Sequence, residues 1–198
     1  MRYCRKLESI LLCLAVFFCA AFPVRAADIA ANSAELVISD DGYSLSANFT
    51  VTLNRRLEEA VNKGVVLHFA ADFELTRSRW YWFDEKVVRL SKMFQLSYHA
   101  LTRQYRLSSG ALHQSFSSLD ETLRVLSRVR HWQVISKEEI SADETYLASV
   151  RMRLDPSQMP KTFQVSALSN RDWNQSSEWL LWNFSSSESE APGAGGER

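Results

Sequence analysis

The feature that most constrains the fold is a stretch of strict alternation between apolar and polar residues from Tyr43 to Leu53. Successive side chains of a β-strand point to opposite faces of a sheet, so this pattern predicts a strand with one buried face and one hydroxyl-rich face. The sequence Asp40-Asp41-Gly42 before it is typical of a tight turn, and Glu35–Ser39 is the expected hairpin partner.

Other segments have strand character too. The residues from Val65 to Leu75 alternate in the same way, and Asp84-Glu85 is an expected turn. A change of apolar register near Ala100-Leu101 predicts a bulge or bend within a strand. The further extended segments begin at Val87, at Leu96 and at Ala111, and cover Thr145–Leu154, Phe163–Leu168 and Trp179–Phe184.

Two helices are expected between these strands. The first covers Arg55–Lys63 and ends at Gly64. The second begins with capping-box spacing at Ser118 and Glu121, and its buried stripe extends to Val129. Helices do not alternate regularly with strands, so the pattern predicts a mainly β (α+β) fold, an antiparallel β-sandwich-like domain with one or two short helices.

The first 26 residues have the three parts of a secretion signal in order. A basic start leads into the apolar run Ile10–Phe22, and Pro23 and Val24-Arg25-Ala26 follow as a cleavage region. A membrane-spanning helix needs about 20 apolar residues, so this run is too short to cross a bilayer core. We therefore expect a cleaved signal peptide (1–26) and a periplasmic protein; the alternative is an inner-membrane anchor through residues 10–22.

The expected mature chain is thiol-free, because Cys4, Cys13 and Cys19 all lie in the signal. Removal of the signal leaves 19 of the 23 basic and 22 of the 23 acidic residues, so the mature chain has a net charge of −3. A negative net charge disfavours nucleic-acid binding. Residues 27–184 are expected to form a single β-rich domain, and residues 185–198 a disordered polar tail. Membrane contact is expected only if the signal stays uncleaved.

The sequence contains no recognisable catalytic motif. The four histidines have no metal-ligand spacing, and neither a nucleophile elbow nor a phosphate-binding glycine loop occurs. His68, Asp72 and Glu74 share the polar face of one expected strand, but roughly 13 Å separates His68 from Asp72 there, which favours a solvated sheet face. We expect no catalytic residue, no cofactor and no metal.

The aromatic run Trp80-Tyr81-Trp82 is the most specific local feature. Flat rings beside Arg77 and Arg79 could stack on a sugar or on peptidoglycan. The favoured interpretation is structural, since aromatic side chains mostly pack in cores. Alternation would then bury Trp80 and Trp82 together and leave Tyr81 outside.

Several of these segments resemble a known family, the exported bacterial proteins grouped as domain-of-unknown-function family 4390. The matching residues are Arg77–Trp82, Leu96–Tyr98, Leu101–Arg106, Leu154-Asp155, Pro160-Lys161, Trp173 and Trp179. The resemblance covers about Glu35–Phe184 and implies a periplasmic or secreted protein of Gram-negative bacteria. The family is associated with genes beside a nitrogen-type membrane sensor kinase, which implies a candidate partner. It offers no catalytic residues to carry over.

Two functions remain open at this stage. The leading hypothesis is a non-enzymatic periplasmic binding or accessory module for a protein partner in the cell envelope, with the exterior part of a sensor kinase as one candidate. The rival is a cell-wall or glycan binder, or a hydrolase. A flat exposed patch would favour the module, and an apolar cleft with buried titratable groups the rival. The possible binding surface consists of Arg77, Arg79, Trp80, Tyr81, Trp82, Tyr98, Arg103 and Tyr105.

Overall fold

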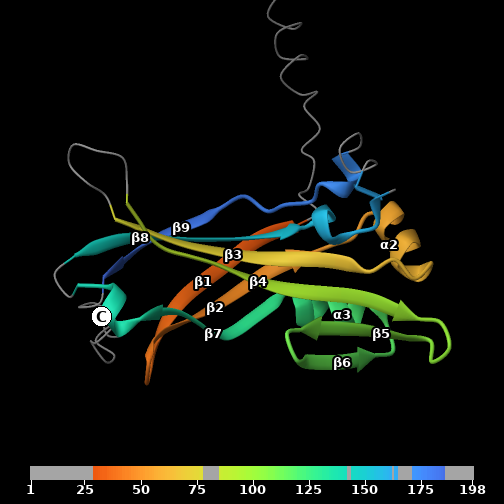
Figure 1. The fold of residues 1–198 in the computed structure, drawn as a ribbon, viewed down its shortest axis with the longest axis horizontal. Helices are drawn as coiled ribbons and strands as arrows, with labels where there is room; N and C mark the ends of the chain where they lie inside the picture. The colour runs from red at the N-terminus through yellow and green to blue at the C-terminus, as the bar shows by residue number, and fades with distance from the viewer. Residues whose placement is uncertain (1–28, 78–84, 142–143, 162, 165–170, 186–198) are drawn as a thin grey trace, which may run out of the picture.

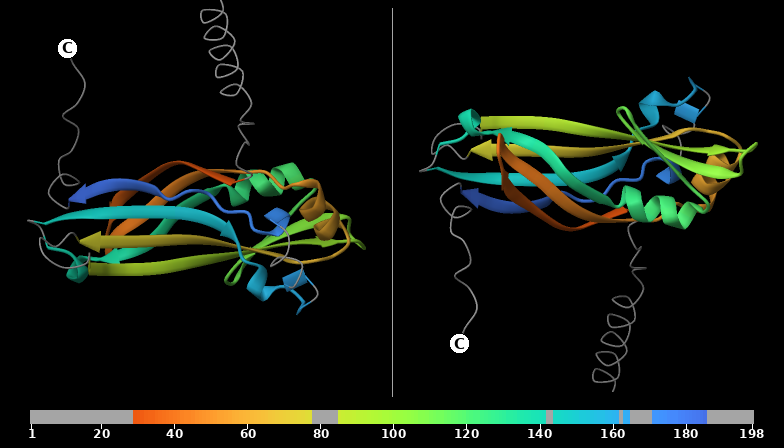
Figure 2. Two further views of the ribbon diagram at one scale, coloured as in Figure 1. Left: turned by 90° about the horizontal axis from the view of Figure 1, so that it is seen from above. Right: turned by 90° about the horizontal axis from the view of Figure 1, so that it is seen from below.

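Two antiparallel β-sheets pack face to face in the computed structural model, which describes residues 29–77, 85–141, 144–161, 163–164 and 171–185 (Figure 1). The small sheet has the strand order β1-β2-β7, and the large sheet has the order β6-β5-β4-β3-β8-β9. Figure 2 shows the two sheets edge-on as separate layers. The predicted β-sandwich-like fold is confirmed.

The small sheet begins with the predicted hairpin. Strands β1 (Ile29–Ser39) and β2 (Gly42–Val51) pair antiparallel, and β7 (Arg128–Ser136) joins the other edge of β2. Gly42 has φ +143° at the turn, and a Cβ there would collide with the carbonyl oxygen of Ile135. Only glycine fits this close approach of β2 to β7.

The large sheet is centred on β3 (Leu67–Arg77), which pairs with β4 (Glu85–His99) on one side and with β8 (Thr145–Leu154) on the other. Its outer strands are β5 (Gln104–Ser109), β6 (Leu112–Phe116) and β9 (Leu180–Ser185). Strand β8 has the bounds that its alternation predicts.

One core lies between the sheets. Along β3, the side chains of Leu67, Phe69, Ala71, Phe73 and Leu75 are fully buried and point toward the small sheet. They pack in the same cluster as Leu45 and Ala47 of β2. The alternate residues of β3 therefore line the outer face of the large sheet.

Two short helices close one end of the sandwich (Figure 1). The Asn54 side chain caps α2 (Arg55–Asn62) by accepting from the amide of Leu57, and Ser118 caps α3 (Leu119–Leu126) by accepting from the amide of Glu121. Single 3₁₀ turns occur at η1 (Lys137–Glu139), η2 (Pro156–Gln158) and η3 (Arg171–Trp173).

Three local predictions are wrong. The register change near Ala100-Leu101 is a hairpin turn between β4 and β5 instead of a bulge within a strand, and Arg103 in it has the left-handed φ of 52°. The helix predicted to reach Val129 ends at Leu126, because Val129 belongs to β7.

The third error concerns Phe163 and Gln164, which were predicted to begin a strand. Their amides donate to the carbonyl oxygen of Pro160 in a helical turn. Proline is favourable at the start of such a turn, because its fixed φ suits a helix and its missing N–H would have no partner there. Residues 165–168 of this prediction lie outside the described residues.

In the part of the chain that the structure describes, no helix is long and apolar enough to cross a membrane.

Candidate binding site

The outer face of the large sheet carries a buried carboxylate. Asp72 on β3 lies opposite Ser91 of β4 and Arg151 of β8, and it is only 6% exposed. Its Oδ1 accepts a hydrogen bond from Ser91 Oγ (2.7 Å), and its Oδ2 accepts from Arg151 Nε (3.0 Å) and Arg153 Nε (2.9 Å). Asp72 therefore holds three strands together on the face that points away from the core.

The pKa of Asp72 reflects two opposing effects. Burial raises it, because the charged form loses water. The hydrogen bonds from Ser91, Arg153 and Arg151 and the positive charge of Arg153 favour the carboxylate form and outweigh burial, so the pKa lies below the ordinary aspartate value. The carboxylate stays ionised and keeps both guanidinium groups fixed.

Arg151 is also fixed from its other side. Its guanidinium carbon lies 4.4 Å from the ring centroid of Trp179, and the cation can interact with the face of this ring. The Arg151 and Arg153 side chains remain 29% and 30% exposed, so both can still reach a partner. Arg153 additionally lies 3.7 Å from a carboxylate oxygen of Asp155.

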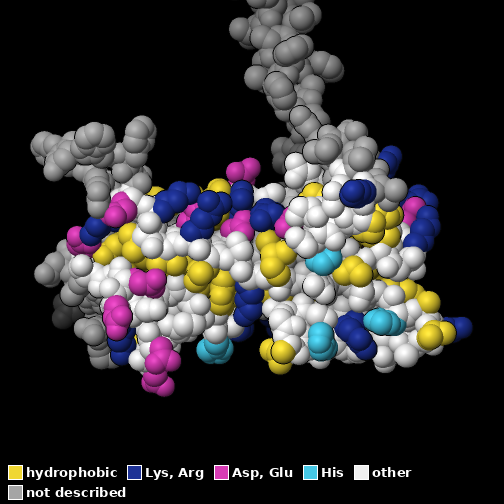
Figure 3. All heavy atoms as spheres, viewed as in Figure 1, with side chains coloured by type: hydrophobic (Ala, Val, Ile, Leu, Met, Phe, Trp, Pro, Cys, Tyr) yellow, Lys and Arg dark blue, Asp and Glu magenta, His cyan; other side chains and the backbone are white. Residues whose placement is uncertain are grey.

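A second carboxylate extends this arrangement along β3. Glu74 pairs with Lys86 (2.9 Å) and Arg89 (3.2 Å), and the side chains of these β4 cations are 54% and 67% exposed. We call the four cations Lys86, Arg89, Arg151 and Arg153 the basic face. Three carboxylates, Asp72, Glu74 and Asp155, leave the cluster with one surplus positive charge. Figure 3 shows charged side chains gathered on the molecule over β3 and β8.

The predicted binding residues that the structure describes lie at two opposite ends of the large sheet. Arg77 is at the end of β3 that pairs with the start of β4, where it donates to Glu85 (2.5 Å) and Glu144 (2.7 Å). These hydrogen bonds raise the pKa of Arg77, so it stays charged. Arg77 therefore ties neighbouring strand ends together instead of presenting a free guanidinium.

Tyr98 and Tyr105 are at the opposite end of the large sheet. Their rings face each other across the β4–β5 hairpin at 4.9 Å, and Tyr105 Oη donates to Asn62 of α2 (2.6 Å). Burial, then the neighbouring Tyr98, raises the pKa of Tyr105. Arg103 lies exposed in the adjacent turn. Ten residues of β3 separate this end from Arg77, a distance of roughly 33 Å along the strand.

The aromatic run itself lies outside the described residues. Arg79, Trp80, Tyr81 and Trp82 therefore carry no structural argument, and the expectation that Trp80 and Trp82 are core residues stays a prediction.

Sequence reasoning missed the cations and the aromatic ring that define the observed site. Arg151 and Arg153 are two apart on β8, so alternation alone places them on one face. Their meeting with Asp72 depends on the pairing of β3 with β8, which no local pattern reveals. Trp179, just before β9, is expected from the sequence only as the start of a strand and as part of the family resemblance, and neither points to Arg151.

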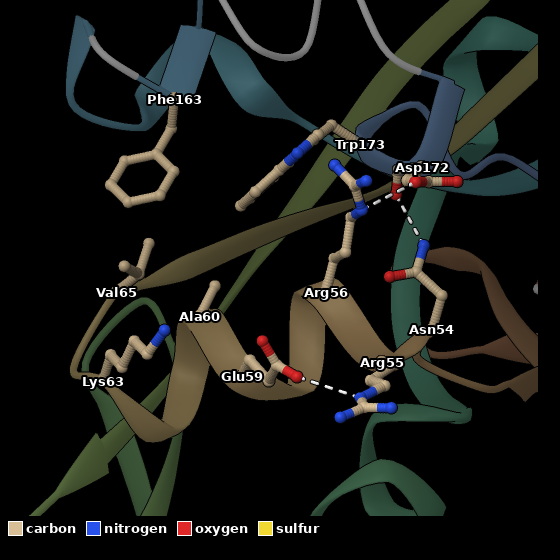
Figure 4. Close-up of a pocket in the computed structure, with 10 residues that line it drawn as sticks. All are labelled: Asn54, Arg55, Arg56, Glu59, Ala60, Lys63, Val65, Phe163, Asp172 and Trp173. Atoms are coloured by element: carbon tan, nitrogen blue, oxygen red, sulfur yellow. Dashed lines mark hydrogen bonds and ion pairs between the residues drawn. The ribbon is translucent and has the colours of Figure 1, made fainter.

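A pocket lies at the helical end of the sandwich (Figure 4). Its volume is about 970 Å³. Phe163 and Trp173 form one wall with ring centroids 5.3 Å apart, and Ala60 and Val65 lie on the opposite side. Lys63 is exposed at its rim.

Four of the five charged residues that line this pocket are paired with one another. Arg55 binds Glu59 (3.0 Å), and Arg56 binds Asp172 (3.1 Å), while Asn54 donates to the backbone oxygen of Asp172 (2.7 Å). An aromatic wall beside a polar rim can hold a small polar ligand.

Among the described residues, no group of three or more His, Cys, Asp or Glu side chains could hold a metal ion. His68 lies on the outer face of β3 as predicted. Burial lowers its pKa, and the nearby Asp155 opposes this shift. His68 therefore stays neutral near pH 7.

The comparisons with known proteins identify a family. Residues 26–183 match the family described as "Domain of unknown function (DUF4390)", and the match begins just after the apolar run of the expected signal. No curated protein and no solved structure matches the chain. The match covers most of the sequence, and the chain belongs to this family.

Proposed function

We propose that this chain is an exported, non-enzymatic binding module that docks a protein partner of the cell envelope on its basic face. The observation that carries the proposal is the fixed guanidinium of Arg151, held between the buried carboxylate of Asp72 and the ring of Trp179. Arginine and tryptophan are among the residues enriched at the energetic centres of protein interfaces, and a fixed arginine loses little conformational entropy when it binds.

The charge of this face favours an acidic surface on the partner. Lys86 and Arg89 are well exposed, and each faces Glu74 with most of its surface still in water. Such rim charges guide association and select partners by electrostatic complementarity. The family resemblance makes the exterior part of a membrane sensor kinase the first partner to test.

Export is part of the proposal. It is supported by the signal-like order of the first 26 residues and by the start of the family match at residue 26. N-terminal sequencing of the protein released from the periplasm should then find a mature start near Ala27. Met1 retained in the membrane fraction would establish the anchored form.

The test of the docking surface is capture from the native envelope. The tagged mature protein should retain one defined protein, and the double change Lys86→Gln and Arg89→Gln should lower its recovery about tenfold. The matched control is Arg124→Gln on α3, an exposed arginine away from the basic face. Equal recovery by the double variant and the wild type would refute docking on this face.

A second candidate, a cell-wall glycan binder, rests on the pocket beside α2. Phe163 and Trp173 supply a stacking wall, and Lys63 supplies a cation at the rim. Both lining carboxylates, Glu59 and Asp172, are bound by arginines, which suits ligand binding better than acid–base chemistry. Calorimetry with soluble peptidoglycan fragments tests it: Phe163→Ala should abolish the binding, and absence of binding to the wild type removes this candidate.

A further inference from the structure

The first half of β4 is an open sheet edge. Within the described residues, Val88–Lys92 pair with β3 on one side and with no strand on the other, because β5 pairs only with Gln95–His99. Backbone groups on such an edge are free to accept another strand. Figure 3 shows hydrophobic side chains along this part of the molecule, below the charged residues over β3 and β8.

The inner face of this edge is incompletely covered. Leu90 points toward the core side of the sheet but is 39% exposed, and half-buried Trp132 of β7 lies on the opposite sheet. Lys92 lies two residues beyond Leu90 on β4, and its Nζ is 6.0 Å from the Trp132 ring centroid. An added strand would cover these apolar groups.

Lys92 is a half-buried cation that has no carboxylate partner among the described residues. It lies on the inner face of the sheet. Burial lowers its pKa accordingly. A carboxylate placed beside it would accept a charge-assisted hydrogen bond from Lys92 in a partly buried site.

The charges of β4 also decide which strand fits. Lys86 and Arg89 lie on the outer face and Lys92 on the inner face, so a second copy of β4 paired edge to edge would bring like charges together. The acidic side chains of an extended segment added to this edge would instead lie near positive charges on both faces of the sheet.

We propose that the Val88–Lys92 edge of β4 receives an extended acidic segment of a partner protein as an added strand, with a carboxylate paired to Lys92. This deepens the proposed function, on which it rests, by naming the kind of segment that binds. Main-chain hydrogen bonds supply affinity in this mode, and alternate side chains supply specificity.

The probe is a synthetic peptide with valines and a central glutamate on one face and threonines on the other, together with its glutamine analogue. Hydrogen exchange of the full mature protein should show protection of those Val88–Lys92 amides that point away from β3. The glutamate peptide should bind about fivefold more tightly than the glutamine peptide.

Variants at Lys92 test whether the charge of this side chain, rather than its size, sets the preference for the glutamate peptide. Lys92→Met should abolish the preference for glutamate, and Lys92→Glu should prefer a peptide with central lysine. The matched control Lys161→Met, an exposed lysine on a distant turn, should behave as wild type. Unfolding midpoints confirm that each variant is folded.

Four results would overturn the inference. Peptide protection at amides other than those of β4 would place binding elsewhere. Edge protection that rises with protein concentration would make a second copy the occupant, and protection lost when residues 186–198 are deleted would make the chain's own tail the occupant. If a partner is captured through Lys86 and Arg89 while the β4 amides stay unprotected, this inference fails and the proposed function is still supported.

Discussion

At the scale of single residues, Asp72 is the most constrained polar group on the outer face of the large sheet. A buried carboxylate without enough hydrogen bonds would lower the stability of the fold. Asp72 avoids this, because three donors from two other strands bind it. Its removal would leave Arg151 and Arg153 without their shared anion. The same residue therefore stabilises the sheet and fixes the guanidinium groups of the basic face.

Replacing Asp72 by asparagine should lower the free energy of unfolding by about 2 kcal/mol, because the hydrogen bonds from Arg151 and Arg153 lose their negatively charged acceptor. Denaturant midpoints measure this loss. The control is Glu59→Gln, which breaks an exposed pair and should change stability by less than about 0.5 kcal/mol. Equal small effects for both variants would contradict this account of Asp72.

The lowered pKa of Asp72 also predicts a pH dependence. A carboxylate whose pKa is lower in the folded than in the unfolded state contributes stability that is complete above the unfolded value of about 3.8. This contribution is lost as the pH falls through the folded value. The difference in stability between wild type and Asp72→Asn should therefore be constant near neutral pH and shrink below about pH 4, which unfolding curves at graded pH would show.

At the scale of elements, a strand could be predicted from the sequence where apolar and polar residues alternate regularly. Strand β8 follows an unbroken period of two, and it was predicted to the residue. Strand β7 was missed, because its pairing with β2 shifts register twice and His131 adopts φ 46°. Both irregularities disrupt the alternation that identifies a strand. The register that sets Asp72 opposite Arg151 joins distant segments, so it required the tertiary structure.

The backbone at His131 gives an unusual prediction. Valine has high β propensity, yet His131→Val should destabilise the protein by about 1–2 kcal/mol, since a branched side chain is strained at positive φ. Asparagine tolerates this conformation, so His131→Asn should be nearly neutral. Thermal unfolding of both variants measures the difference, and a valine variant more stable than the wild type would contradict backbone strain at this position.

At the scale of the whole molecule, one core joins the two sheets. Leu45 of β2 and Phe69 of β3 are both fully buried in it. Neither sheet can lose its partner without exposing this shared apolar surface. The basic face and the open edge of β4 are therefore supported by packing from both layers.

Truncation in either sheet should weaken the whole domain. Leu45→Ala and Phe69→Ala should each cost about 3–4 kcal/mol, and in each variant tryptophan fluorescence and far-ultraviolet circular dichroism should report the same midpoint. Two separated transitions, with only one moved by Leu45→Ala, would mean that the sheets unfold independently.

The strand pairing has a further consequence for how the chain reaches its final shape. Asp72 and Arg151 are direct neighbours across β3 and β8, although they are 79 residues apart in the chain. Strand β2 likewise pairs with β7, which lies far along the sequence. Long segments must be brought together before these contacts give any stability, so folding should be slow, in milliseconds to seconds. A chain that emerges N-terminus first holds two half-built sheets with exposed edges until β7 and β8 appear. During that interval the unpaired edges are open to other strands.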